Sequence, residues 1–195
     1  MTKLYLFDIK NYLKSNNEKF KIIPPSFKKR IDRYKDEYDK LRSSIGYYLL
    51  IKYLKEDFNI EINDEDILTN KFDKPYIKNN PIYFSISHSL NFVCVLLSDN
   101  ECGLDIQHDD NLTHEKLAKK ILLDKEYEMY EKNRDILFKK WVQIEAYYKK
   151  MGTGIKYNNL DISIDYMVYE IFDNQNNKYY LSATAKFEKV ILKKL

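Results

Sequence analysis

The chain has 195 residues, of which 44% are hydrophobic and 15% aromatic, and 33 Lys and Arg against 30 Asp and Glu leave a net charge of +3. Such a length allows one substantial core or two small lobes that share an interface, and this apolar fraction argues against global disorder. The mild charge offers no general case for nucleic-acid binding, and no apolar run approaches the roughly 18 residues of a membrane span. We therefore expect a soluble cytoplasmic protein that binds neither nucleic acid nor a membrane.

The first predicted element is a strand around Leu4 and Leu6, after which the Pro24-Pro25 pair interrupts the chain. Apolar residues then recur at steps of three or four, which predicts one long amphipathic helix over 31–49. The residues of this apolar face are Ile31, Tyr34, Tyr38, Leu41, Ile45, Tyr48 and Leu49.

Strands are predicted next, because residues 82–87 alternate between apolar and polar side chains. Residues 92–107 read as a hairpin whose turn is Asp99-Asn100-Glu101. The period of two then places Asp105 and Gln107 together on one face of the second strand of this hairpin.

Two helices are expected in the second half of the chain, over 115–122 and over 137–151, with Asp135 as the N-cap of the latter. Strands are expected over 160–172 and 178–187, joined by a turn at 173–177. This order of elements predicts an α+β fold with a helix and a sheet in each half.

The two cysteines, Cys94 and Cys102, lie in apolar, strand-like stretches. Their spacing matches neither a C-x-x-C motif nor a zinc site. We expect buried free thiols and no redox chemistry.

Polar residues are concentrated where buried strands would ordinarily be apolar, in residues 84–89 and 103–107. Ser87 and His88 can donate hydrogen bonds to phosphate oxygens, and Asp105 can hold a hard cation against the same phosphates. A strand-end cap beside a surface aspartate is the alternative explanation, and these residues alone do not decide between the two.

Glu145 and Lys149 lie four residues apart on a predicted helix, where an exposed ion pair is the simplest interpretation. However, Ile144 and Tyr148 of the apolar face immediately precede the two charges. Both charges therefore lie at the edge of the buried face, which is typical of residues that line a cleft.

These segments resemble the signature of the 4′-phosphopantetheinyl transferase superfamily. Residues 102–107 are similar to its (V/I)-G-(V/I)-D-(V/I)-E element, with Gln107 in place of Glu. Residues 141–149 are similar to its (F/W)-x-x-K-E-(A/S)-x-x-K element, with Ile144 in place of Lys.

Three upstream segments extend the resemblance across most of the chain. Residues 84–89 resemble the F-(S/N)-(I/L)-S-H-S element, and Lys74-Pro75 resembles the end of a G-K-P element in which Asp73 replaces Gly. Arg42 falls where the surfactin-synthetase-type members carry a phosphate-binding arginine. Five elements in the same order make the resemblance specific.

The resemblance implies a pseudo-twofold pair of similar lobes, an N-terminal lobe over 1–100 and a C-terminal lobe over 101–195, with the active site at their interface. It implies a monomeric, Mg²⁺-dependent enzyme that transfers 4′-phosphopantetheine from coenzyme A to a serine of an apo acyl or peptidyl carrier protein, releasing adenosine 3′,5′-bisphosphate.

The resemblance also implies roles for individual residues. Asp105, Glu145 and Gln107 are the expected metal ligands, and Glu145, Lys149 and Asp105 the catalytic residues. The expected contacts to coenzyme A are Arg42, Lys74, Pro75, Ser87, His88 and Lys149, with Lys28 or Arg30 as further candidates.

Gln107 and Ile144 depart from the pattern and motivate a different class of function. A glutamine oxygen can ligate Mg²⁺ but removes a negative charge, so metal binding without substrate should be weaker. A catalytically degenerate protein that only binds coenzyme A or a carrier protein is therefore the alternative. A basic nucleic-acid-binding protein is a third, but the sequence contains no such motif.

Overall fold

The computed structural model describes residues 1–10, 25–112, 114–155, 166–187 and 190–193. Its helices are α2 (Pro25–Ile31), α3 (Glu37–Phe58), α4 (Glu115–Ile121), α5 (Asp124–Tyr130) and α6 (Asp135–Met151), with a short 3-10 helix η2 (Asp64–Asp66). Its strands are β1 (Thr2–Asp8), β2 (Ile67–Thr69), β3 (Pro75–Ile77), β4 (Tyr83–Ser89), β5 (Phe92–Ser98), β6 (Leu104–His108), β7 (Val168–Phe172), β8 (Lys178–Ala183) and β9 (Val190–Lys193). The expected mixture of helices and strands is confirmed.

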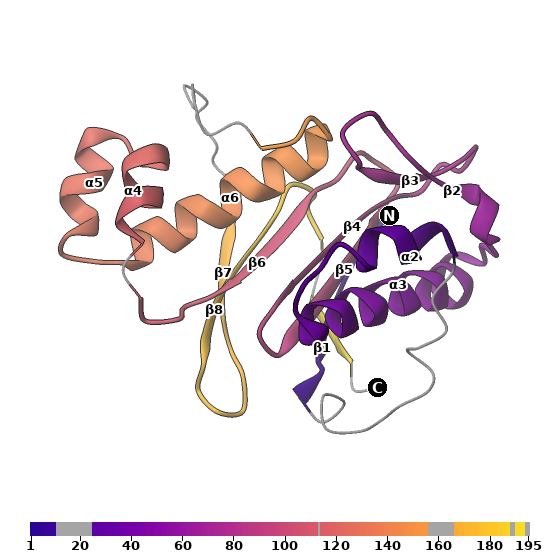
Figure 1. Ribbon diagram of the computed structural model, residues 1–195, viewed down its shortest axis with the longest axis horizontal. Coiled ribbons are helices and arrows are strands. Elements are labelled where there is room, and N and C mark those ends of the chain that lie inside the picture. The colour runs from indigo at the N-terminus through magenta and orange to yellow at the C-terminus, as the bar shows by residue number, and fades with distance from the viewer. Residues whose placement is uncertain (11–24, 113, 156–165, 188–189, 194–195) are drawn as a thin grey trace.

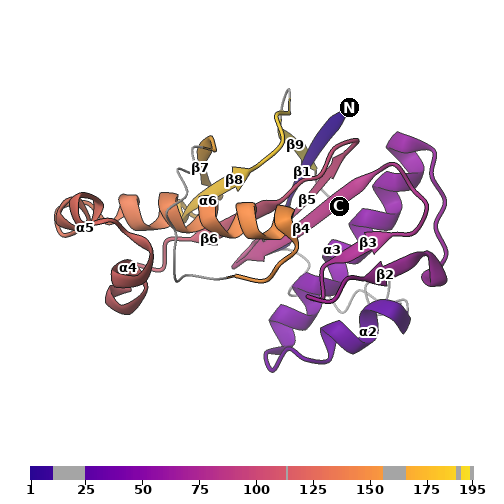
Figure 2. The same ribbon diagram turned by 90° about the horizontal axis from the view of Figure 1, so that it is seen from above.

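A four-stranded sheet in the order β4-β5-β1-β9 has α3 packed against it (Figures 1 and 2). The central strands β1 and β5 are apolar on both faces, as expected of strands that are covered on both sides. Tyr5 and Phe7 point into a core with α3, whereas Leu4 and Leu6 point into a second core on the opposite face. This alternation places the first sheet between two apolar layers.

The second core also packs against a three-stranded sheet in the order β6-β8-β7. Leu104 and Ile106 of β6 and Leu181 of β8 enter it from this second sheet. On the other face of β8, Tyr180 packs with Phe138 of α6. Figure 1 shows the result, with α4–α6 and β6–β8 in one half of the molecule and α2, α3 and β2–β5 in the other.

The predicted hairpin over 92–107 is wrong. β5 pairs with β4 and β1, whereas β6 pairs antiparallel with β8, Leu104 lying opposite Ala183. The actual hairpin is β4–β5, and its turn includes Leu90 in the left-handed region at φ 45°. An alternating pattern shows which face of a strand is buried but does not identify the neighbouring strand.

The continuous helix predicted over 31–49 is also wrong, because α2 ends at Ile31 and α3 begins at Glu37. The carboxylate of Asp36 accepts a hydrogen bond from the Asp39 N–H at 2.9 Å and caps α3. The apolar period continues across the break because Ile31 packs into the same core as α3. The helix then runs beyond the predicted range to Phe58.

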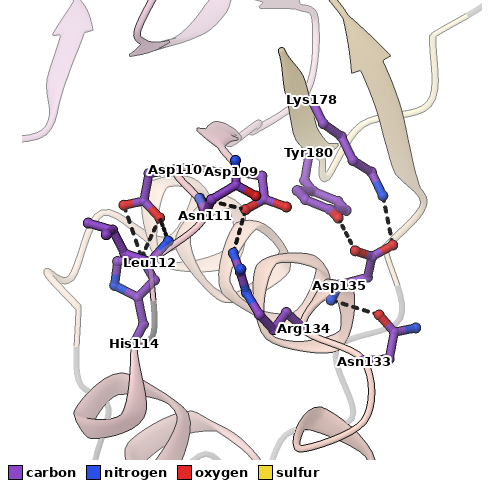
Figure 3. A network of polar contacts seen from close by, with 10 residues as sticks. All are labelled: Asp109, Asp110, Asn111, Leu112, His114, Asn133, Arg134, Asp135, Lys178 and Tyr180. Carbon is purple, nitrogen blue, oxygen red and sulfur yellow. Dashed lines mark hydrogen bonds and ion pairs between the residues drawn. The ribbon is translucent and has the colours of Figure 1, made fainter. Parts of the chain in front are cut away.

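Asp135 is the first residue of α6 and not its N-cap, which is Arg134. Its carboxylate instead accepts hydrogen bonds from the Tyr180 hydroxyl at 2.5 Å and Lys178 at 2.7 Å (Figure 3). Arg134 donates to Asp109 at 2.7 Å, directly after β6. These polar contacts fix the start of α6 to the second sheet.

The remaining sequence predictions concern the C-terminal strands, the cysteines and the absence of a membrane span. The turn at 173–177 and a strand on either side of it are confirmed, but β7 begins only at Val168 and β8 ends at Ala183, before residue 187. Residues 160–165 of the first predicted strand lie outside the described part. The small β2–β3 sheet and β9, which runs parallel to β1, were not predicted. Cys94 and Cys102 are buried free thiols, as expected. None of the described helices is long and apolar enough to cross a bilayer.

Gly103 lets α6 approach the beginning of β6. A Cβ at this position would lie 1.9 Å from the Ala146 carbonyl oxygen and 2.5 Å from the Lys150 backbone nitrogen. We expect Gly103→Ala to lower the free energy of unfolding by about 3 kcal/mol or more, because backbone atoms must move. Urea unfolding measures this loss.

Gly154→Ala is the control for this substitution. Its Cβ would meet no atom within 4 Å, but its φ of 71° is unfavourable for alanine. The expected loss is about 1 kcal/mol. Equal losses at the two positions would contradict the steric argument.

Candidate functional site

A cavity of about 340 Å³ lies between the two sheets and the C-terminal half of α6. Most of the site residues that were predicted from the sequence line this cavity: Lys74, Pro75, Ser87, His88, Asp105, Gln107, Glu145 and Lys149. They come from the β2–β3 loop, the start of β3, β4, β6 and α6. The fold therefore gathers them in one place.

Asp105 lies at the centre of the site and is only 1% exposed. Its Oδ1 accepts hydrogen bonds from Lys149 Nζ at 2.6 Å and Ser87 Oγ at 2.8 Å, and its Oδ2 accepts one from Gln107 Nε2 at 3.0 Å. A buried carboxylate requires such donors, because an unpaired buried charge costs several kcal/mol. Asp105 and Gln107 share a face of β6, as the alternation predicted.

Serine side chains of β4, and not backbone-to-backbone hydrogen bonds, hold β6 beside β4. The Oγ atoms of Ser85, Ser87 and Ser89 accept hydrogen bonds from the backbone N–H groups of residues 104, 106 and 108 at 3.0, 3.3 and 2.9 Å. Every second residue of one strand therefore contacts every second residue of the other. This register brings Ser87 to Asp105.

Glu145 and Lys149 line the cavity one helical turn apart, as their position at the edge of the apolar face predicted. Lys149 forms its ion pair with Asp105, on a different element. The indole N–H of Trp141, one turn earlier, donates to Glu145 Oε1 at 3.3 Å. The carboxylate and the ammonium group thus face the same space from one rigid helix.

Ile144 points away from the cavity and is completely buried. It packs with Ala118 and Ile121 of α4 and with Leu137. An unpaired lysine would be costly at this position in this packing. Ile144, which replaces the lysine of the family pattern, therefore serves the apolar packing between α4 and α6.

His88 is neutral at pH 7, because burial lowers its pKa to about 4 and the nearby charges of Arg42 and Lys149 act in the same direction. Its Nε2 lies 3.1 Å from the Ser43 hydroxyl. A neutral imidazole retains one N–H donor, so His88 can still hydrogen-bond an anion.

Arg42 is not among the described residues that line the cavity. Its guanidinium group donates to Asp39 at 2.6 Å and to the Leu90 carbonyl oxygen at 3.2 Å. Arg30 lines the cavity instead, and it donates to the Asp73 carbonyl oxygen. From the sequence, Arg30 was a further candidate together with Lys28. Of these two, only Arg30 lines the cavity.

Tyr34 and Ser43 also line the cavity and were missed as site residues. The helical period places Tyr34 on the apolar face of the predicted helix, and no sequence pattern identifies Ser43. Both lie beside His88, because the Ser43 hydroxyl is 3.1 Å from its Nε2 and the centroid of the Tyr34 ring is 5.9 Å from that of the imidazole.

The oxygen-bearing side chains fit a hard cation. Asp105, Glu145 and Gln107 all line the cavity, and carboxylate and amide oxygens are the ligands that Mg²⁺ prefers. Within the described ranges no three His, Cys, Asp or Glu residues are grouped as metal ligands, so the third ligand at this site would be the Gln107 amide. At present the Gln107 amide donates to Asp105, so presenting its oxygen requires rotation of the amide.

Three known families or proteins are similar in sequence to this chain. The family model described as 4′-phosphopantetheinyl transferase, N-terminal, matches residues 13–100. The 4′-phosphopantetheinyl transferase gsp of Aneurinibacillus migulanus is 31% identical over 152 residues, covering 74% of this chain and 60% of the relative. The 4′-phosphopantetheinyl transferase Sfp of Bacillus subtilis is 25% identical over 146 residues, covering 71% of this chain and 65% of the relative.

The matched region thus spans less than two thirds of the length of either curated relative. The family match and both relatives nevertheless lead to one group of proteins. The family match and both relatives support the 4′-phosphopantetheinyl transferase superfamily, and within it the surfactin-synthetase type that the motifs of this chain resemble.

The pKa of His88 makes stability depend on pH. The unfolded chain binds a proton at this imidazole below pH 6.5, whereas the folded chain binds it only near pH 4. The free energy of unfolding should therefore fall by up to roughly 3 kcal/mol between pH 6.5 and 4. In His88→Gln this contribution is absent, and urea unfolding across the pH range gives the difference between the two chains. Parallel curves would contradict a buried neutral His88.

Proposed function

We propose that this protein transfers the 4′-phosphopantetheine arm of coenzyme A to a serine of an apo acyl or peptidyl carrier protein. The observation that carries the proposal is the buried Asp105, paired with Lys149 and Ser87 at the wall of a cavity. In a chain of this superfamily, such a site combines oxygen ligands for a cation with donors for phosphate oxygens.

We further propose a two-lobed monomer, with an N-terminal lobe over 1–100 and a C-terminal lobe over 101–195. In support, α3 packs on the first sheet and α6 on the second, and the cavity lies between them. The last strand, β9, returns to pair with β1 in the first sheet.

Coenzyme A binding is supported by the donors that surround the cavity. The ammonium group of Lys149 and the hydroxyl of Ser87 face the place proposed for the diphosphate, and the His88 N–H lies on the same strand as Ser87. Arg30 and Lys74 add positive charge to the lining of the cavity, where the 3′-phosphate would bind and where Pro75 would contact the nucleotide. We retain Arg42 as a proposed supporting charge beside His88, which its field already affects.

Asp105 and Glu145, with the Gln107 amide oxygen, would hold Mg²⁺. The cation, when bound, would neutralise charge on the diphosphate during transfer. Once a cation and diphosphate occupy the cavity, Lys149 is expected to exchange its Asp105 contact for a phosphate oxygen. Its 2.6 Å ion pair therefore keeps this ammonium group in place between turnovers.

The transfer forms one P–O bond and breaks another. The carrier serine oxygen attacks the β-phosphorus of coenzyme A, and adenosine 3′,5′-bisphosphate leaves with the bridging oxygen. Glu145 is the proposed acceptor of the serine proton, directly or through water, and Lys149 would neutralise the charge that grows on the leaving phosphate. The hydrogen bond from Trp141 supports a fixed orientation of Glu145.

The function is tested by incubating the purified chain with coenzyme A, Mg²⁺ and several apo carrier proteins. Intact-protein mass spectrometry should show the gain of one phosphopantetheine on at least one carrier, and none when the acceptor serine is replaced by alanine. Binding of coenzyme A without transfer to any carrier would indicate the degenerate binding protein instead.

Gln107 should make the enzyme demand more Mg²⁺ than its Gln107→Glu variant. A second carboxylate beside Asp105 attracts the dication more strongly, so half-maximal activity should need roughly tenfold less free Mg²⁺. Without Mg²⁺ the two carboxylates repel each other, so in EDTA the variant should have a lower melting temperature than the wild type. Adding Mg²⁺ should raise the melting temperature of the variant more than that of the wild type.

Asp105→Asn is the matched control, because it keeps the shape of the side chain and removes the charge. It should abolish transfer nearly completely. Full activity of Asp105→Asn, together with an unchanged Mg²⁺ requirement in Gln107→Glu, would refute the metal assignment.

A further inference from the structure

The loop between β2 and β3 contacts the C-terminal end of α6, far away in the sequence (Figure 1). The side-chain N–H of Asn70 donates to the Gly152 carbonyl oxygen at 2.8 Å, and Lys74 Nζ donates to the Lys150 carbonyl oxygen at 2.6 Å. The last carbonyl groups of a helix have no partner within it. The loop thus satisfies two carbonyl groups at the end of α6.

Asn70 also determines the shape of the loop. Its Oδ1 accepts hydrogen bonds from the backbone N–H groups of Phe72 at 2.9 Å and Lys74 at 3.0 Å. The backbone N–H of Asn70 donates to the Lys74 carbonyl oxygen at 2.9 Å. Asp73, at φ 64°, completes this tight turn. One side chain therefore both folds the loop and attaches it to α6.

The contact is close enough to require a glycine on the helix side. A Cβ on Gly152 would lie 2.7 Å from Lys74 Cδ and 2.9 Å from Asn70 Nδ2, and Gly152 itself has a φ of 61°. The ammonium group of Lys74 is partly withdrawn from water, and this burial lowers its pKa. The contact is therefore a packed junction and not a loose surface encounter.

The two connected segments both line the cavity. The loop contributes Phe72, Asp73 and Lys74, and the last turns of α6 contribute Glu145 and Lys149. The serine contacts between β4 and β6 fix a different wall. The spacing between the loop and the reactive groups of α6 consequently depends on the junction made by Asn70 and Lys74.

We propose that Asn70 is a positioning residue that sets the distance between the wall that borders the nucleotide and the wall that carries Glu145 and Lys149. The inference rests on the proposed function for its ligand, but the coupling of the two walls is a property of the chain itself. Asn70 touches neither the cation ligands nor the reacting atoms, and it acts through the loop and the helix end.

Asn70→Asp separates the two tasks of this side chain. The carboxylate retains the acceptor for the Phe72 and Lys74 N–H groups, so the loop keeps its turn. It places an oxygen against the Gly152 carbonyl and a negative charge at the C-terminus of a helix, both of which are unfavourable. The junction should open while the loop remains folded.

The matched control is Asn80→Asp. Asn80 lies in the next loop, where its Oδ1 accepts a hydrogen bond from the Ile82 N–H at 2.9 Å. It is absent from the residues described around the cavity. This variant makes the same chemical change without affecting the contact with α6.

Isothermal titration of both variants with coenzyme A and Mg²⁺ should show affinity about tenfold weaker for Asn70→Asp and unchanged for Asn80→Asp. In transfer assays, the KM for coenzyme A should rise similarly in Asn70→Asp, whereas the KM for the carrier protein stays within about twofold. Wild-type affinity and KM in Asn70→Asp would overturn the proposal.

Hydrogen exchange of the ligand-free chains tests the coupling independently of the proposed function. In Asn70→Asp, amide protection should fall in residues 70–75 and 149–152 together, and should remain as in the wild type in β5. Loss confined to 70–75 would refute the junction. If the wild type binds no coenzyme A, the proposed function fails, and hydrogen exchange alone decides the role of Asn70.

Discussion

The buried carboxylate of Asp105 imposes the strongest constraint on this molecule. At 1% exposure it has lost its water, so protein donors must replace the solvent. The donors come from three elements: Ser87 on β4, Gln107 on β6 itself and Lys149 on α6. Removing one partner of a buried ion pair typically costs about 3–5 kcal/mol, so the two sheets and α6 are tied to one arrangement around this group.

Close backbone approaches make that arrangement possible. Gly103 admits the backbone of α6 against β6, and Gly152 admits the β2–β3 loop against the end of the same helix. Both glycines act on α6, one beside Asp105 and the other beyond Lys149. The helix that carries Glu145 and Lys149 is therefore held at both ends of its functional segment, and its start is held by the contacts of Asp135 with the second sheet. A rigid helix presents charged groups with less reorganisation than a loop would.

The polar residues chosen from local patterns proved more reliable than the predicted connections between strands. The alternation along β6 placed Asp105 and Gln107 on one face, and the helical period placed Glu145 and Lys149 at the edge of a cleft, and all four line the cavity. Both inferences depend only on neighbours within one element. By contrast, the hairpin predicted between β5 and β6 was wrong. β6 pairs with β8, which is distant in sequence: Leu104 and Ala183, for example, are 79 positions apart.

What the sequence alone determined is therefore local: the faces of strands and helices, the buried thiols, and the motifs that indicate a superfamily. These follow from periodicity and residue chemistry, which act over a few residues. Only the tertiary structure decided which cation pairs with Asp105, that Arg30 and not Arg42 lines the cavity, that Ile144 belongs to an apolar contact with α4, and that Asn70 joins the β2–β3 loop to α6. Each of these depends on which distant segments meet, and that is decided by the packing of two sheets around a shared core and not by any pattern along the chain.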